Sequence, residues 1–217
     1  MRSPGGRGDW RVYVITADPA QARGRSHIEI AEAAIRGGAT AVQLRMKNAP
    51  ARTVLETARR IAARCRDAGV AFIVNDRVDV ALAAEAGGVH VGQDDLPAAA
   101  TRALLGAAPY LGVSAATREE ADAASRDGAD YLGVGAVYAT ATKPDAGEAV
   151  GIARVREVAA SCDLPVVGIG GITIENAAPV IRAGAAGVAV ITAVTMADDM
   201  AAATRRLREE VDRARAG

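Results

Sequence analysis

Aromatic residues are scarce in this chain of 217 residues, since Phe, Trp and Tyr together make up 3% of it. Proteins that bind single-stranded nucleic acid stack bases on such rings, so the scarcity argues against that class. Net charge is also absent, because 26 basic side chains balance 26 acidic ones. No overall field would draw the protein to nucleic acid or anionic lipid, and any anion site has to be local.

Cysteine pairs and long apolar runs are missing too. Cys65 and Cys162 are far apart and match no metal-ligand spacing, which favours reduced thiols over a disulfide framework. The longest apolar run, residues 183–194, is shorter than the ~20 residues that cross a bilayer. No apolar stretch of signal-peptide length follows residues 1–9. We expect a soluble, cytoplasmic protein without a membrane partner.

Short β-rich apolar runs alternate with longer stretches of helical periodicity, a pattern typical of repeated βα units around a parallel sheet. Eight such units are present, with predicted strands at Val12–Thr16, Ala41–Leu44, Ala71–Val74, Gly88–Val91, Tyr110–Val113, Tyr131–Val134, Val166–Ile169 and Val188–Ile191. Helices are predicted near residues 27–37, 51–68, 77–86, 97–106, 117–127, 151–161, 174–183 and 198–214. We therefore predict an α/β protein, a single (β/α)8 TIM barrel at residues 10–217, preceded by a flexible segment at residues 1–9.

Active sites of such barrels lie on the loops that follow the strands. The second predicted strand runs into Gln43, Arg45 and Lys47, which alternation places on one side, opposite Leu44 and Met46. An arginine fork beside a lysine suits a multiply charged phosphate. An ordinary polar strand end is the alternative.

Carboxylates follow the third and fourth strands. Asn75 and Asp76 end the third strand, and Asp95 comes shortly after the fourth. Paired carboxylates on adjacent loops can hold Mg²⁺, which also binds substrate phosphates. Alternatively, Asp76 is a helix N-cap and Asp95 a plain loop carboxylate. His90 is interpreted as a hydrogen-bonded structural residue rather than a general base.

Hydroxyl groups and another cation follow the fifth and sixth strands. Ser114 has no His–Asp set to make it a nucleophile, so hydrogen bonding to a phosphate is the better interpretation. Thr140, Thr142 and Lys143 lie in a loop of ~15 residues, which is long enough to be functional.

A second anion site is indicated after the seventh and eighth strands. The run 167–173 contains three glycines, including Gly171, which let backbone N–H groups approach an anion. The eighth strand is expected to end at Ile191 and Thr192, and loops after these two strands often cradle phosphate. Two anion sites imply two phosphorylated reactants.

The linked motifs resemble those of the thiamine phosphate synthase family from about Val12 to Val194. They are Gln43-Leu44-Arg45-Met46-Lys47, Asn75-Asp76-Arg77, Gly92-Gln93-Asp94-Asp95-Leu96-Pro97, Thr140-Ala141-Thr142-Lys143-Pro144 and Ile169-Gly170-Gly171-Ile172. The resemblance implies a transferase that couples an aminopyrimidine diphosphate to a thiazole phosphate, carboxylated or not, with loss of pyrophosphate.

The resemblance also implies roles for individual residues. Contacts to the aminopyrimidine diphosphate are implied for Gln43, Arg45, Lys47, Asn75, Ser114 and Lys143, with Ser114 and Lys143 as the catalytic pair. Mg²⁺ ligands are implied at Asp76 and Asp95, and thiazole phosphate contacts at Thr140, Thr142, Gly171, Ile191 and Thr192.

The chain departs from the family at several places. Ala116 stands where the family usually has a histidine, Ala136 and Ala139 stand where prolines are usual, and Thr192 replaces a serine. Two rival functions stay open, a thiazole tautomerase-like relative and a non-catalytic barrel that binds phosphorylated metabolites. The expected partners are small molecules, and a homo-oligomer is left open.

Overall fold

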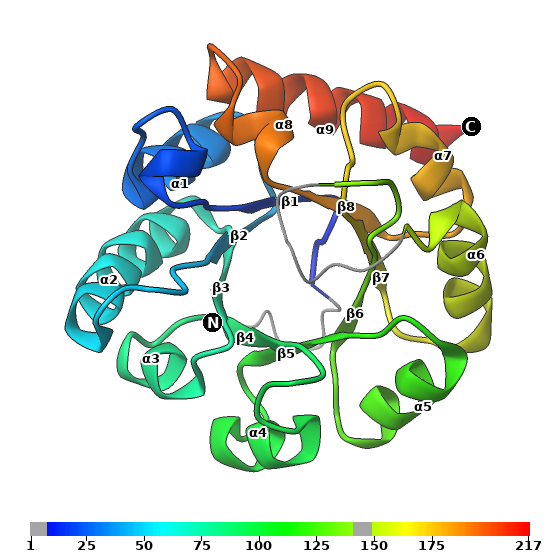
Figure 1. Ribbon diagram of the computed structural model, residues 1–217, viewed down its shortest axis with the longest axis horizontal. Helices are drawn as coiled ribbons and strands as arrows, with labels where there is room; N and C mark the ends of the chain where they lie inside the picture. The colour runs from blue at the N-terminus through cyan, green and yellow to red at the C-terminus, as the bar shows by residue number, and fades with distance from the viewer. Residues whose placement is uncertain (1–7, 141–148) are drawn as a thin grey trace.

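The computed structural model describes residues 8–140 and 149–217 and contains eight parallel strands that pair in sequence order, with β1 also paired to β8. The sheet closes into a barrel, and the helices form a ring outside it (Figure 1). The strands are β1 (Val12–Ile15), β2 (Ala41–Leu44), β3 (Ala71–Asn75), β4 (Gly88–Val91), β5 (Tyr110–Ser114), β6 (Tyr131–Val134), β7 (Val166–Ile169) and β8 (Gly187–Val190). The predicted (β/α)8 barrel is confirmed.

Helices follow every strand. They are α1 (His27–Arg36), α2 (Ala51–Ala68), α3 (Val78–Ala83), α4 (Ala98–Leu105), α5 (Arg118–Arg126), α6 (Gly151–Ser161), α7 (Ala177–Arg182), α8 (Thr192–Thr195) and α9 (Met200–Ala216), with a 3-10 turn, η1 (Pro19–Gln21), before α1. Side-chain caps explain several of their starts. Ser26 and Glu29 form a capping box at α1, and Asp199 accepts a hydrogen bond from the Ala202 N–H at α9.

The predicted boundaries agree with these elements to within a few residues, except near the eighth strand. That strand ends at Val190, and the next residues turn into α8, a short helix that the sequence pattern does not predict. Ile191 is the N-cap of α8 and Thr192 is its first residue. The predicted strand over Val188–Ile191 is therefore wrong at its end, because four residues of helix carry too little periodicity to be distinguished from an apolar strand.

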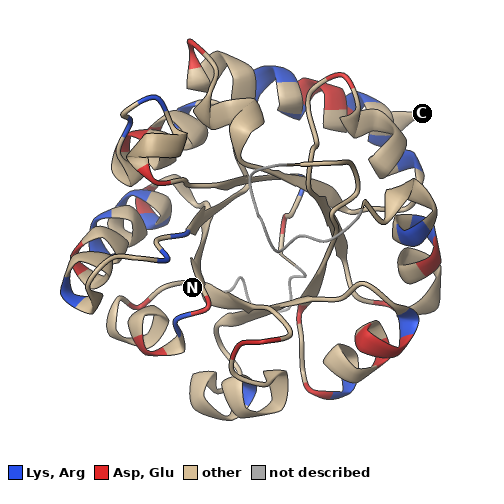
Figure 2. Cartoon of the chain, viewed as in Figure 1, with Lys and Arg blue, Asp and Glu red and all other residues tan. Residues whose placement is uncertain are grey.

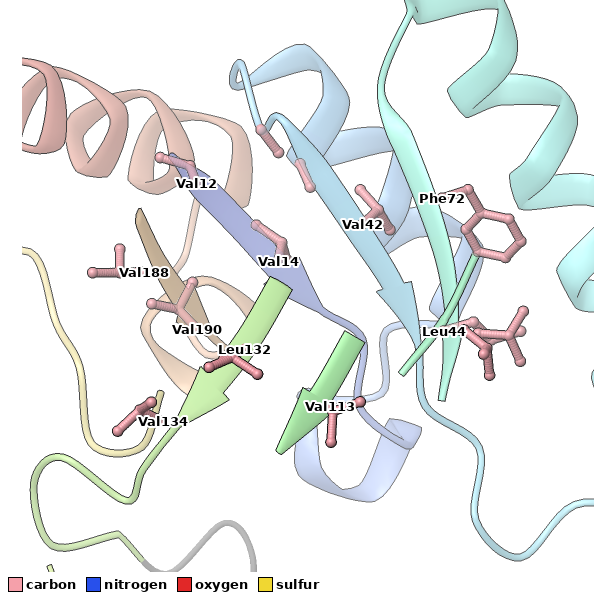
Figure 3. Packing of buried hydrophobic residues seen from close by; sticks show 14 of the residues in the cluster. Val12, Val14, Val42, Leu44, Phe72, Val113, Leu132, Val134, Val188 and Val190 are labelled. Atoms are coloured by element: carbon pink, nitrogen blue, oxygen red, sulfur yellow. The ribbon is translucent and has the colours of Figure 1, made fainter. Parts of the chain in front are cut away.

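Side chains alternate between two cores along each strand. Val12 and Val14 of β1 point outward and pack in the same cluster as Leu44 of β2, between sheet and helices (Figure 3). Tyr13 and Ile15 belong to a second cluster, inside the barrel. Both faces of the strands are buried, which is why the runs read as apolar throughout. Each buried Val or Leu contributes about 1.5–3 kcal/mol relative to exposure.

Most of the scarce aromatic residues lie in the inner cluster. Trp10, Tyr13, Tyr110 and Tyr131 are four of the six aromatic residues, which are one Trp, four Tyr and one Phe. Trp10 stacks on Tyr131 with ring centroids 3.9 Å apart, and its carbonyl packs against Gly187 at the start of β8. The segment before β1, dark blue in Figure 1, crosses the barrel in that view. Trp10 thereby fills the amino-terminal end of the barrel and leaves the carboxyl-terminal end to a pocket.

Charged side chains lie on the outer helices and the loops, while the barrel strands are almost free of them (Figure 2). Among the described residues, no helix combines the length and the apolar character needed to span a membrane.

Candidate active site

A pocket of about 350 Å³ opens where the carboxyl ends of the strands meet. Its volume is within the range typical of small-molecule sites. Eight of the residues singled out in the sequence line it, namely Gln43, Arg45, Asn75, Ser114, Thr140, Gly171, Ile191 and Thr192. Thr142 and Lys143 lie outside the described residues, so their predicted roles stay predictions. Thr192 lines the pocket as the first residue of α8 and not, as expected, as the end of β8.

The end of β2 separates its side chains as the alternation predicts. Gln43 is 3% exposed and points into the barrel, where its Nε2 donates a hydrogen bond of 2.8 Å to the Tyr13 hydroxyl. Leu44 packs in the outer core. Arg45 lies just beyond the strand, and its backbone N–H donates to Thr16 Oγ1 at 3.2 Å. Lys47 is exposed.

The carboxylates of Asp76 and Asp95 meet, as the sequence predicts. Burial, followed by a hydrogen bond and like charge from Asp95, raises the pKa of Asp76 to about 6. The positive charges of Lys47 and Arg45 act on the same carboxyl group in the opposite direction. The loops after β2, β3 and β4 therefore bring two acids and two cations to one part of the rim.

Backbone geometry supports a special role for Asp76. Its φ is +61°, a left-handed conformation that few non-glycine residues adopt, and its N–H donates to the His90 carbonyl at 2.8 Å. The alternative that Asp76 caps α3 is wrong, because the N-cap is Arg77 and it makes no side-chain capping bond. Asp95 does serve its loop, since one carboxylate oxygen accepts the Gly92 N–H at 2.7 Å.

This pair of carboxylates fits Mg²⁺ by its donor chemistry. The nearby charge of Asp95 adds to the effect of burial on Asp76, and a divalent cation bound by both carboxylates would relieve that repulsion. No group of three or more His, Cys, Asp or Glu side chains gathers in a metal-binding cluster within residues 8–140 and 149–217. Asp76 and Asp95 would therefore supply two oxygens, and water and substrate phosphates the others, which is the usual pattern for Mg²⁺.

Five side chains form a continuous hydrogen-bonded series across the barrel, which we call the interior chain. Its bonds join Gln43 to Tyr13 (2.8 Å), Tyr13 to Tyr131 (3.0 Å), Tyr131 to His90 Nδ1 (3.1 Å) and His90 Nε2 to Ser114 Oγ (3.1 Å). All five residues line the pocket. The hydrogen-bonded interpretation of His90 is confirmed, and its imidazole points into the barrel rather than toward the helices.

Glycines make room for the interior chain. A Cβ on Gly112 would lie 2.1 Å from the Tyr131 ring and 2.4 Å from His90 Nδ1. A Cβ on Gly133 would lie 3.0 Å from His90 Cε1. Any side chain at Gly112 would thus displace both rings, so the β5 and β6 strands carry glycine where two rings cross the barrel.

The second predicted anion site lies on the loops after β7 and β8. Gly170 and Gly171 have positive φ angles of 99° and 63°, and a Cβ on Gly171 would lie 2.7 Å from the Ala139 carbonyl oxygen. Asn176 braces the turn, because its Nδ2 donates to the Gly171 carbonyl at 3.0 Å and its Oδ1 accepts the Thr173 N–H at 2.7 Å. The two glycines after β7 and the short helix α8 after β8 match the usual phosphate site of such barrels.

Some pocket residues were not anticipated from the sequence. Tyr13 and Tyr131 read as ordinary apolar strand residues. Glu120 sits in the first turn of α5, where its carboxylate accepts the Ala116 N–H, and it also lines the pocket. Thr117 followed three residues later by a glutamate is a helix-start pattern that marks the turn, although nothing in that pattern points to a pocket.

Comparison with known proteins agrees with this geometry. The family model for thiamine monophosphate synthase matches residues 12–194. This chain belongs to that family. The thiamine-phosphate synthase of Moorella thermoacetica is 54% identical over 206 residues, covering 95% of this chain and 98% of that protein. The thiamine-phosphate synthase of Chloroflexus aurantiacus is 56% identical over 200 residues, with 92% of each chain covered.

A solved structure extends the match to three dimensions. The thiamine phosphate pyrophosphorylase from Pyrococcus furiosus superposes with a TM-score of 0.87 at 38% identity, covering 96% of this chain and 98% of that one. The family resemblance drawn from the sequence is confirmed. Relatedness at this level favours the synthase over the tautomerase-like and binding-only alternatives.

Proposed function

We propose that this chain couples an aminopyrimidine carrying a diphosphate to a thiazole phosphate, and so forms thiamine phosphate and pyrophosphate. The observation that carries the proposal is the meeting of Asp76 with Asp95 beside Arg45 and Lys47. Two acids for a divalent cation and two basic side chains for phosphate oxygens form a site for a metal-bound diphosphate.

The reaction class follows from the charges at the rim. The bond between the pyrimidine methylene carbon and the diphosphate oxygen breaks, and its electron pair leaves with pyrophosphate. Arg45 and Lys47 stabilise the negative charge that develops there, as Lys143 would by the family resemblance. Mg²⁺, held by Asp76 and Asp95, would add to this charge stabilisation when bound.

Positioning accounts for the second half of the reaction. The thiazole nitrogen forms the new bond to the methylene carbon, and no nucleophile from the protein is needed. The glycine cradle, with Thr140, Thr142, Ile191 and Thr192, would hold the thiazole phosphate so that this nitrogen faces the carbon. The Ser114 hydroxyl, which lines the pocket, would donate a hydrogen bond to the diphosphate. Loss of carbon dioxide follows when the thiazole is carboxylated.

A direct coupling assay tests the proposal. Purified protein, Mg²⁺ and the two phosphorylated heterocycles should give thiamine phosphate and pyrophosphate in equal amounts. Mass spectrometry measures the first product, and phosphate release after addition of inorganic pyrophosphatase measures the second. Addition of EDTA should stop turnover. Isomerised thiazole phosphate without coupling would contradict the proposal in favour of a tautomerase, and binding of both compounds without product would leave a binding protein.

A further inference from the structure

The donors and acceptors of the interior chain allow its hydrogen bonds to be assigned one common direction. Gln43 donates from its amide nitrogen to the Tyr13 hydroxyl, which fixes the amide so that Oε1 is left as an acceptor. A tyrosine hydroxyl has a single hydrogen. Each buried hydroxyl hydrogen needs an acceptor, and the amide nitrogen of Gln43 cannot accept the hydrogen of Tyr13. The distances fit either direction, so we assign the Tyr13 hydrogen to the Tyr131 oxygen and the Tyr131 hydrogen to His90 Nδ1 on this requirement.

The imidazole carries the direction onward. Because Nδ1 of His90 accepts, the proton of the neutral ring is on Nε2, and this N–H donates to Ser114 Oγ at 3.1 Å. The hydrogen of Ser114 is then available to a molecule in the pocket that this side chain lines. The whole series has an acceptor, Oε1 of Gln43, at one end and a donor, the hydroxyl of Ser114, at the other.

Burial and packing hold the side chains of the interior chain in place. Tyr131 is fully buried and Tyr13 is 2% exposed, so the two hydroxyls depend on each other and on their neighbours in the interior chain for hydrogen bonds. Trp10 stacks on the Tyr131 ring at 3.9 Å, and Gly112 leaves space for that ring and no more. Hydrogen bonds in series polarise one another in such a low-dielectric interior, which strengthens a common direction.

We propose that Tyr13, Tyr131 and His90 are positioning residues that align the interior chain as a dipole matched to the charge separation of the coupling reaction. The inference rests on the proposed function. Departure of pyrophosphate leaves positive charge on the pyrimidine and its amino group, which an amide acceptor stabilises. The leaving group gains negative charge, which a hydroxyl donor stabilises. Dipoles oriented before the reaction need no reorganisation when the charges appear.

The direction of the chain is measurable without substrate. The protein has two histidines, His27 and His90, so ¹⁵N-histidine labelling gives two imidazole signals, assigned with a His27→Gln variant. At pH 8, where an ordinary imidazole is neutral, His90 should show a protonated Nε2 and an unprotonated Nδ1. A proton on Nδ1 would overturn the inference, because the chain would then run toward Gln43. This outcome is independent of whether the coupling assay succeeds.

Enzyme kinetics test whether the direction of the interior chain affects turnover. Tyr131→Phe removes the donor to His90 Nδ1 and should mix the two tautomers of that ring. It should lower kcat about 2- to 10-fold, the effect of one neutral hydrogen bond, with a smaller change in KM for the diphosphate. Tyr110→Phe is the matched control, because Tyr110 belongs to the same aromatic cluster without being in the chain, and it should change neither the tautomer nor kcat.

A double-mutant cycle distinguishes an effect transmitted through the interior chain from a general effect on packing. If Tyr131 acts through His90 on Ser114, Tyr131→Phe should lower kcat by a smaller factor in a Ser114→Ala protein than in the wild type. If the loss of kcat in the double variant equals the product of the losses in the two single variants, the positioning role is overturned. Equal losses in Tyr110→Phe and Tyr131→Phe would also overturn it, since both would then report packing. If the wild type forms no product at all, the proposed function fails and the tautomer measurement still decides the direction.

Discussion

Replacing Asp76 with asparagine should stabilise the metal-free protein at pH 8 while greatly reducing its turnover. The pKa of Asp76 is raised from 3.8 to about 6, first by burial and then by Asp95. The folded state thus holds this proton more tightly than the unfolded chain does. The free energy of unfolding therefore falls as pH rises from about 4 to about 6, and the loss persists at higher pH. Asparagine removes the charge, and it tolerates the left-handed backbone at this position.

The size of the gain follows from the pKa. A rise from 3.8 to about 6 corresponds to about 3 kcal/mol if no screening is applied. Asp76 keeps part of its surface in water, so screening reduces the effect to about 1–1.5 kcal/mol. About 1 kcal/mol shifts Tm by roughly 2–4 °C in a chain of this size. We expect Asp76→Asn to raise Tm by about 2–5 °C at pH 8 in EDTA and to have little effect near pH 4.

Calorimetry at the two pH values, with and without Mg²⁺ and pyrophosphate, measures this. A ligand at 100 times its Kd stabilises the folded state by about 2.7 kcal/mol, so the wild type should become the more stable protein once both ligands are added. Asp67→Asn, the same change on an exposed part of α2, should leave Tm unchanged throughout. A variant at Asp76 that is no more stable than the wild type at pH 8 in EDTA would refute the idea that burial and the neighbouring Asp95 destabilise the charged form of Asp76.

Two further substitutions separate local strain and ion pairing from function. Gly171→Ala should lower the free energy of unfolding by about 1–3 kcal/mol and raise KM for the thiazole phosphate at least 10-fold. The reason is that the new Cβ would lie 2.7 Å from a carbonyl oxygen. Gly24→Ala is the control, because Gly24 has a φ of +80° in open space, and it should show a milder destabilisation and normal kinetics. Arg102→Met breaks a largely buried pair with Asp130 and bonds to three backbone carbonyls, and should cost about 2–4 kcal/mol at unchanged kcat. Arg118→Met, in an exposed pair, should cost less than about 1 kcal/mol, and equal losses from the two arginine variants in urea denaturation would contradict this ranking.

The barrel and the rim charges could be predicted because both depend on local order in the chain. Apolar runs of four or five residues followed by amphipathic stretches indicate βα units, and the residue after each run must lie at the carboxyl end of the barrel. Asp76 and Asp95 follow neighbouring strands, so they meet whatever the details of packing. Arg45 and Lys47 follow the strand next to them.

The interior chain could not be predicted, since it joins residues that only the closed barrel brings together. Tyr13 and Tyr131 are 118 residues apart, on strands that are not neighbours, and they meet across the lumen. In the sequence each reads as one large residue in an apolar run. The one usable signal is glycine, because Gly112 and Gly133 lie in the middle of strands, where a close approach by another group is a common reason for that residue.

The helix α8 could not be predicted from the sequence for a different reason. Its start at Thr192 depends on the turn at Ile191, whose φ and ψ of −115° and −81° belong to neither strand nor helix. Apolar residues on both sides conceal that turn. Thr192 nevertheless lines the predicted pocket, because it follows the end of β8 by only two residues.

The groups that interact with the substrate electrostatically are neutral inside the barrel and charged at its rim. Burial raises the pKa of Tyr131 well above its ordinary value, so its hydroxyl keeps its hydrogen over the whole physiological range. A full charge at that depth would carry a large desolvation penalty, whereas an aligned series of neutral dipoles does not. The rim is partly hydrated and can hold acids, bases and a cation, whose mutual interactions weaken with salt. The pyrimidine would therefore lie against a series of neutral dipoles that salt hardly changes, while its diphosphate lies among charges that salt screens.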